Sequence, residues 1–159
     1  MDGNEADVKP DGATDRTEEF MRQALRLARV ALERGEVPVG SIVVHRGRVV
    51  GEGIEGVQNE KDLTAHAEIK AINEACRILD TFCLRGCELY TTVEPCFMCS
   101  FVIRSAGISR VVIGKAVPYI GGVSSRHPIL VDSGIPKWPR PPVIVSGVLE
   151  KECTELFAR

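Results

Sequence analysis

Apolar and polar positions alternate with a helical period near the start of the chain and with a strand period after it. From Asp15 to Gly35, apolar side chains recur every three or four positions, which predicts an amphipathic helix (Phe20, Ala24, Leu27, Ala28, Ala31, Leu32). Two β-rich runs, 39–45 and 48–54, flank a turn at Gly47 and predict a hairpin. Residues 1–14 are polar, acidic and interrupted by Gly and Pro, so we expect a disordered tail there.

The rest of the pattern predicts helices and strands in alternation. Helical spacing returns over 65–80, from Pro95 to about Gly107, and in a last helix at 149–158. Strands are expected at 88–93, 111–113 and 143–146. Residues 114–141 are rich in Gly, Pro and Ser and are expected to be irregular, with a helical turn at 124–131. This order of elements predicts a three-layer α/β fold, in which a mixed sheet has helices on both faces.

The composition is that of one ordinary globular domain, which we place at residues 15–159. Of the 159 residues, 44% are hydrophobic and 26% are charged, a balance that is typical of a folded protein and not of a disordered one. The net charge of -2 gives no overall positive field to attract nucleic acid. No apolar run has the length of a membrane span and the first residues lack a signal-peptide pattern, so we expect a cytoplasmic protein without membrane association.

Two short motifs carry the candidate chemistry. His66-Ala67-Glu68 lies at the start of the helix 65–80, and Pro95-Cys96-Phe97-Met98-Cys99 at the start of the next one. Cys96 and Cys99 are three residues apart, so their sulfurs share one helix face, and Pro95 suits the first helical position. Residues two apart on a helix face away from each other, so His66 and Glu68 converge only if His66 precedes the helical geometry.

Two thiolates and one imidazole predict a Zn²⁺ site with three protein ligands: His66, Cys96 and Cys99. Three ligands leave a fourth position for water, which is the arrangement of catalytic zinc, and zinc lowers the pKa of such a water to about 7. Glu68 is not needed as a ligand and is placed to move protons. The alternative is a structural zinc, closed by a fourth side chain (Cys83, Cys87 or His127), with Glu68 a solvated helix residue.

These motifs, together with the stretches 35–40, 51–53, 63–68, 89–96 and 147–149, resemble the cytidine/deoxycytidylate deaminase superfamily. The sequence is most similar to the bacterial tRNA-specific adenosine deaminase branch, over about residues 22–157, with cytosine and guanine deaminases as relatives. The resemblance implies the cytidine deaminase-like fold, five strands with the last ones parallel, and hydrolytic deamination. It also implies that His66, Cys96 and Cys99 hold zinc, that Glu68 is the proton shuttle, and that the protein is a homodimer.

The resemblance further indicates a substrate pocket. Family members line it with backbone around the positions of Ala67 and Pro95 and with the turn Val37-Pro38, although a plain strand entry explains that turn equally well. Where these deaminases usually carry an Asn after the second strand, this sequence has Glu55. An amide donates and accepts hydrogen bonds, whereas a carboxylate only accepts them, so we expect a substrate edge rich in N–H donors. The alternative is that Glu55 points to solvent.

Residues 117–141 also depart from the family's tRNA-facing segment. With Glu55 and the slightly acidic balance, this favours a zinc deaminase of a small heterocycle (guanine-, cytosine-, creatinine- or amino-triazine-like). The alternative function is a tRNA-specific deaminase that converts the wobble adenosine to inosine. A third hypothesis, a non-catalytic zinc-bearing partner subunit, would most simply have lost Glu68, which is present.

Overall fold

Helices and strands follow one another closely through residues 11–158, the part of the chain that the computed structural model describes. The helices are α1 (Asp11–Glu33), α2 (Val57–Glu60), α3 (Ala67–Leu79), α4 (Phe97–Ala106) and α5 (Glu150–Glu155), the last continued by a 3₁₀ turn, η1 (Leu156–Ala158). The strands are β1 (Gly40–His45), β2 (Arg48–Ile54), β3 (Cys87–Val93), β4 (Arg110–Lys115) and β5 (Val143–Val145). None of the described helices has both the length and the apolarity needed to cross a membrane.

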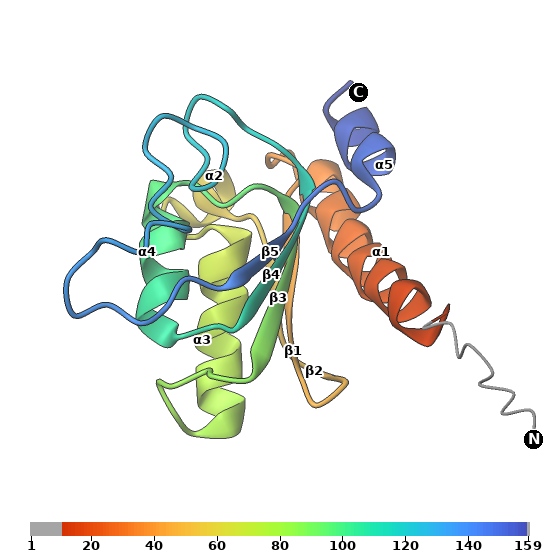
Figure 1. The fold of residues 1–159 in the computed structure, drawn as a ribbon. Helices are drawn as coiled ribbons and strands as arrows, with labels where there is room; N and C mark the ends of the chain where they lie inside the picture. The colour runs from red at the N-terminus through yellow and green to blue at the C-terminus, as the bar shows by residue number, and fades with distance from the viewer. Residues whose placement is uncertain (1–10, 159) are drawn as a thin grey trace, which may run out of the picture.

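The strands form one mixed sheet of five strands in the order β2-β1-β3-β4-β5. Strand β1 pairs antiparallel with β2 and β3, whereas β3, β4 and β5 run parallel. Helices α1 and α5 cover one side of the sheet, and α3 and α4 cover the other (Figure 1). The predicted mixed sheet with helices on both faces and parallel last strands is therefore confirmed.

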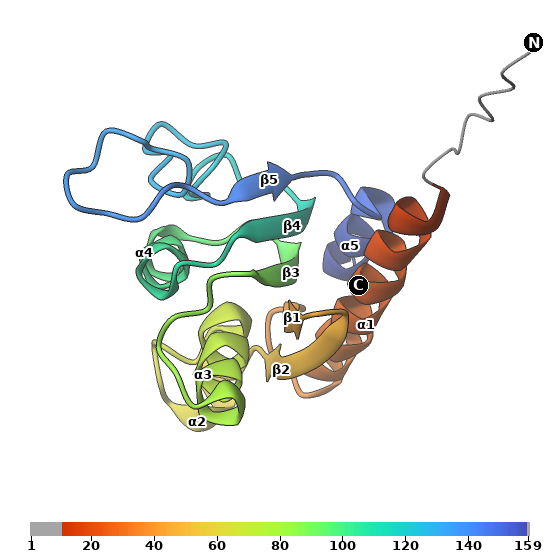
Figure 2. The same ribbon diagram turned by 60° about the horizontal axis from the view of Figure 1, so that its bottom comes forward.

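Alternate side chains of each strand enter two separate hydrophobic clusters, one on each face of the sheet. Val43 and Leu89 pack with residues of α3 and α4, whereas their neighbours Ile42 and Tyr90 pack with residues of α1 and α5. Successive residues of a strand point to opposite faces, so one sheet serves both clusters. The turned view shows the resulting three layers, with the strands between the two helix pairs (Figure 2).

Two glycines of β2 let α3 approach the sheet closely. A Cβ atom at Gly53 would overlap the carbonyl oxygen of Ala67, and one at Gly51 would overlap that of Ala71. These obstacles are backbone atoms and cannot rotate away. The glycines therefore fix the position of the first turn of α3, which carries one of the two candidate motifs.

The structure corrects three local predictions. Helix α1 begins at Asp11 and not at Asp15, so residues 11–14 of the predicted tail are helical, while residues 1–10 lie outside the described residues. The single turn α2 was missed, because its start is stabilised from a distance by Glu36. The predicted helical turn at 124–131 is wrong: these residues form turns and bends, and the N–H of Leu130 binds the carbonyl of Gly122 instead of that of Arg126.

Candidate zinc site and substrate cavity

The two motifs lie at the N-termini of α3 and α4, and the first ligand of each motif is the residue directly before its helix. His66 is the N-cap of α3 with an extended backbone (φ -76°, ψ 146°), so it precedes the helical geometry and can turn toward Glu68, as predicted. Cys96 is likewise the extended N-cap of α4 (φ -70°, ψ 179°). Pro95 therefore stands before the cap, and its predicted place as the first helical residue is wrong.

The three predicted zinc ligands converge. One ligand atom from each of His66, Cys96 and Cys99 lies within 4.8 Å of the other two, and among the side chains that the structure describes this is the only such group. The Nδ1 atom of His66 lies 3.6 Å from the Sγ of Cys96 and 3.4 Å from that of Cys99. Two sulfurs and one imidazole nitrogen at these separations suit tetrahedral zinc with a fourth position for water.

The three side chains of the triad hold their protons unequally. The hydrogen bond from the Cys99 thiol lowers the pKa of Cys96 to about 4, although burial opposes this shift. The hydrogen bond with Cys96 raises the pKa of His66 to about 9. A thiolate is thus already favoured at Cys96, and zinc would displace the protons of His66 and Cys99.

The alternative of a closed structural site finds no support in the fold. Cys83 is exposed, and Cys87 contacts His45 at 3.5 Å instead of the triad. The exposed ring of His127 packs edge-on against Phe97, with ring centres 6.0 Å apart. None of these three side chains belongs to the group of converging ligands, so the fourth position stays available.

Glu68 lies directly beside the triad. Its side chain is 4% exposed, and its Oε2 atom lies 3.6 Å from the Sγ of Cys99. Burial raises the pKa of Glu68 to about 7, helped by the neighbouring Cys96 and Glu55. A carboxyl group that titrates near neutrality can both accept and donate a proton at the pH of a cell.

A cavity of about 390 Å³ opens next to the triad. Among the five predicted substrate-binding residues, Val37 and Glu55 line it together with His66, Glu68 and Cys96 (other lining residues include Glu36, Glu94, Lys115, Val117, Tyr119, Ile120 and Phe157). Pro38, Ala67 and Pro95 are buried and do not line the cavity. The N–H of Ala67 donates to Glu55 and the carbonyl of Pro95 accepts from Gly122, so a contact of these three residues with substrate stays a prediction.

Glu55 faces the cavity and not the solvent, with 7% exposure. Its Oε2 atom accepts a hydrogen bond of 3.3 Å from the N–H of Ala67, the first residue of α3. Burial raises the pKa of Glu55, while the nearby His66 and this backbone hydrogen bond oppose the rise. The predicted solvent-facing alternative is therefore wrong, and the contact with a substrate stays a prediction.

Two further carboxylates of the cavity were missed as functional residues. Glu36 accepts hydrogen bonds from the N–H groups of Gln58 (3.1 Å) and Asn59 (2.6 Å) and so caps α2. Glu94 accepts four hydrogen bonds from residues 117–124. For Glu94 a sequence signal existed, since it directly precedes Pro95-Cys96, but its partners lie more than twenty residues away.

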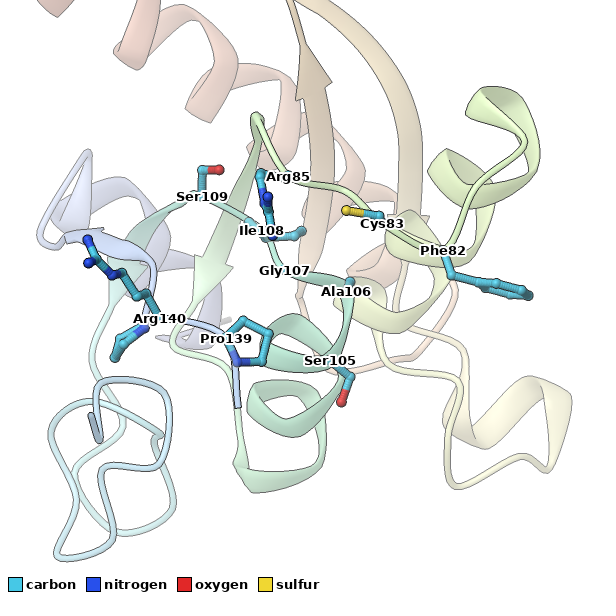
Figure 3. A pocket seen from close by; sticks show the side chains of 11 residues that line it. Phe82, Cys83, Arg85, Ser105, Ala106, Gly107, Ile108, Ser109, Pro139 and Arg140 are labelled. Atoms are coloured by element: carbon cyan, nitrogen blue, oxygen red, sulfur yellow. The ribbon is translucent and has the colours of Figure 1, made fainter. Parts of the chain in front are cut away.

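A larger cavity, of about 730 Å³, lies elsewhere in the fold. It lies between the loop before β3, the loop before β4 and residues 139–141, and its lining includes Arg85, Ile108 and Arg140 (Figure 3). These loops precede β3 and β4, whereas the zinc ligands follow β3, so the two cavities are at opposite ends of the sheet. Size alone therefore does not identify the reacting centre.

Comparisons with known proteins agree with the site. Residues 14–115 match the family described as the cytidine and deoxycytidylate deaminase zinc-binding region. The tRNA-specific adenosine deaminase of Aquifex aeolicus is 48% identical over 113 residues, covering 71% of this chain and 75% of that protein. The enzyme of the same name from Bacillus subtilis is 37% identical over 134 residues, covering 84% of this chain and 81% of that protein.

Solved structures of deaminases are also similar to this chain. A chain from work on A-to-I editing by tRNA:A34 deaminases has a TM-score of 0.81 at 39% identity, over 87% of this chain and 98% of that one. A guanine deaminase from Bacillus subtilis has a TM-score of 0.61 at 37% identity, over 62% of this chain and 64% of that one. The family match covers well over half of the sequence and includes His66, Cys96 and Cys99, which are placed to hold a zinc ion. The chain thus belongs to the cytidine and deoxycytidylate deaminase family.

Proposed function

We propose that this protein is a zinc-dependent hydrolytic deaminase that converts the wobble adenosine of a tRNA to inosine. The observation that carries the proposal is the similarity to tRNA-specific adenosine deaminases, which extends over most of the chain. The net reaction replaces the amino group of the base by a carbonyl, consumes one water and releases ammonia.

The proposed roles follow from the site. Zinc held by His66, Cys96 and Cys99 would supply Lewis-acid activation of a water molecule. Glu68 takes one proton from the attacking water and delivers it to the ring nitrogen beside the reacting carbon, which keeps it in the product. It then carries the second water proton, from the new hydroxyl group, to the amino group, which departs as ammonia. Its buried carboxyl, with a pKa of about 7, suits both transfers.

The mouth of the cavity is compatible with a base turned out of an RNA loop. Tyr119 is 85% exposed there, and the ring of Phe157 lies under the Nζ atom of Lys115, 5.0 Å from the ring centre. Sequence-specific RNA recognition commonly places unstacked bases on exposed aromatic rings and the backbone beside cations. These residues therefore support a polynucleotide substrate.

A second candidate rests on Glu55. The carboxylate stands in the cavity where an amide is usual in the family, and a carboxylate can only accept hydrogen bonds. The ring nitrogens of adenine other than the attachment point are acceptors, whereas guanine-, creatinine- or amino-triazine-like heterocycles carry N–H donors. A small-molecule deaminase is therefore the second function that we propose.

One assay separates the candidates. Zinc-loaded protein is incubated with an anticodon stem-loop carrying a wobble adenosine and with free bases, nucleosides, creatinine and amino-triazines, and ammonia and inosine are measured. We expect turnover of the stem-loop, lowered about 10²–10⁴-fold by Glu68→Gln and unchanged by the exposed control Glu52→Gln.

Turnover of a free heterocycle alone would overturn the tRNA proposal and support the second candidate. In that case Glu55→Asn should shift the preference toward adenine-type bases. No turnover of any substrate by protein with one zinc per chain would favour the non-catalytic partner subunit. The homodimer implied by the family resemblance stays a prediction, which sedimentation equilibrium tests directly.

A further inference from the structure

A buried carboxylate connects the zinc motif to one wall of the substrate cavity. Glu94 follows β3, directly before Pro95 and the ligand Cys96, and is only 5% exposed. Both of its oxygens are fully used. Oε1 accepts hydrogen bonds from the N–H of Val117 (3.0 Å) and the hydroxyl of Ser124 (2.6 Å). Oε2 accepts them from the N–H groups of Val123 (3.0 Å) and Ser124 (2.9 Å).

Residues 117–124, which we call the wall segment, supply three residues to the cavity lining: Val117, Tyr119 and Ile120. The segment has neither helix nor regular strand of its own. Its internal hydrogen bonds are limited to turns, such as Gly121 N–H to the carbonyl of Val117 at 2.8 Å. Its shape therefore depends on groups outside it.

The same segment is bound to the backbone beside the zinc ligand. The N–H of Gly122 donates to the carbonyl of Pro95 (2.9 Å), and Gly121 forms an isolated antiparallel bridge with Cys96. A Cβ atom at Gly121 would overlap the carboxylate of Glu94, so the close approach requires glycine there. The wall segment thus lies in close contact with the Glu94 side chain.

Each of the four hydrogen bonds of the Glu94 carboxylate comes from a donor in residues 117–124. Three backbone N–H groups converge on this carboxylate. A glutamine amide at the same position could not bind them all, because its nitrogen is itself a donor and would face other donors. The arrangement is therefore specific for a carboxylate.

We propose that Glu94 is a positioning residue that holds the wall segment against the zinc motif and thereby sets the affinity for substrate. It contacts neither a zinc ligand side chain nor Glu68 through any hydrogen bond of the described structure, so it acts on binding and not on the reacting atoms. The proposal rests on the deaminase function proposed above.

The test combines kinetics with hydrogen exchange on zinc-loaded, full-length protein. We expect Glu94→Gln to raise KM at least about tenfold with kcat within about threefold of the wild type, because a displaced wall weakens binding while Glu68 and the zinc ligands stay in place. Zinc content should stay at one per chain, and the amides of peptides covering 117–124 should exchange faster. The matched control is Glu52→Gln, an exposed carboxylate of β2.

If Glu94→Gln does not fold, Ser124→Ala tests the same proposal with a smaller change, since it removes only one of the four hydrogen bonds to Glu94. It should raise KM about two- to fourfold and speed exchange in the same peptides. An unchanged KM with unchanged exchange overturns the proposal. A fall in kcat at constant KM, or loss of zinc, also overturns it, because the residue would then act on the reacting centre.

A failure of the Glu94 proposal can be distinguished from a failure of the proposed deaminase function. The kinetics use whichever substrate of the panel the wild type deaminates, and a wild type that deaminates none contradicts the proposed function. In that case hydrogen exchange and the binding of the anticodon stem-loop, measured by fluorescence anisotropy, still decide the role of Glu94. Slower exchange at 117–124 in the wild type than in Glu94→Gln, with weaker binding by the variant, supports it.

Discussion

Arg104 of α4 carries one of the few fully buried charges of the protein, and its replacement should destabilise the fold. Its side chain is 2% exposed and has no carboxylate partner within hydrogen-bond distance among the described residues. The guanidinium instead donates to three carbonyl oxygens, those of Ile129, Asp132 and Pro139, each at 2.8 Å. It also lies over the ring of Trp138, 4.8 Å from the ring centre.

The magnitude follows from these contacts. A hydrogen bond to a charged group contributes about 1.5–3 kcal/mol, and a stacked cation–π contact about 0.5–2 kcal/mol. Two effects reduce the loss in Arg104→Met: the variant no longer buries a charge, and it removes the buried Nε atom, which lacks a hydrogen-bond partner. Methionine also retains much of the apolar packing. We therefore expect a loss of about 2–4 kcal/mol in the free energy of unfolding.

The assay is urea unfolding of the zinc-loaded protein at pH 7, followed by circular dichroism. Arg77→Met is the control, because Arg77 is exposed on the last turn of α3 and its replacement should change the free energy by less than about 0.5 kcal/mol. The loss of unfolding free energy in Arg104→Lys should lie between those of Arg77→Met and Arg104→Met. Lysine keeps the positive charge but lacks the planar guanidinium group that donates to several carbonyls at once. A loss below about 1 kcal/mol for Arg104→Met would refute the reasoning. It would mean that water molecules replace the guanidinium as hydrogen-bond donors to the three carbonyl oxygens with little loss of stability.

Three shorter predictions concern the metal, pH and the close approach of α3. Cys99→Ser should reduce the zinc content after dialysis, measured by mass spectrometry, well below one per chain, whereas the exposed control Cys83→Ser should keep it. Because the pKa of Glu94 is lower in the folded protein, its stabilising contribution is fully present above the ordinary glutamate pKa of about 4.3 and is lost as the pH falls through the folded value. Urea midpoints between pH 6 and 3 should therefore fall less steeply in Glu94→Gln, and parallel curves would contradict this. Gly53→Ala should cost about 2–4 kcal/mol in unfolding free energy, since its Cβ would overlap the carbonyl oxygen of Ala67, and a thermal midpoint equal to that of the wild type would contradict the packing.

Residues 117–141 show why part of the site was inaccessible to sequence reasoning. The segment was expected to be irregular, and it is, but it is also firmly bound: Glu94 holds its first part and Arg104 its second. Trp138 packs against Phe101 at 5.3 Å between ring centres, whereas Tyr119 lines the cavity. The acceptors and donors involved are mostly backbone groups, which have no signature in the sequence.

Substrate preference is the point on which sequence similarity and site chemistry diverge. The relatives favour a tRNA adenosine, while Glu55 in the cavity favours a ring edge with N–H donors. The divergence is confined to one side chain and its surroundings, so the panel assay and the Glu55→Asn variant address it directly.

The sequence by itself determined the layered fold and the candidate zinc ligands. The layers follow from short-range patterns, and the two ligand motifs are short runs whose combination resembles that of a known family. Hydrophobic periods of two and 3.6 residues specify strands and helices, and each ligand motif sits at a helix N-terminus. Only the tertiary structure decided which carboxylates reach the cavity and what they bind. Glu36, Glu55 and Glu94 are alike as residues, and their roles differ because each meets backbone N–H groups from a segment between 12 and 30 positions away, a pairing that the folded chain creates and no local pattern encodes.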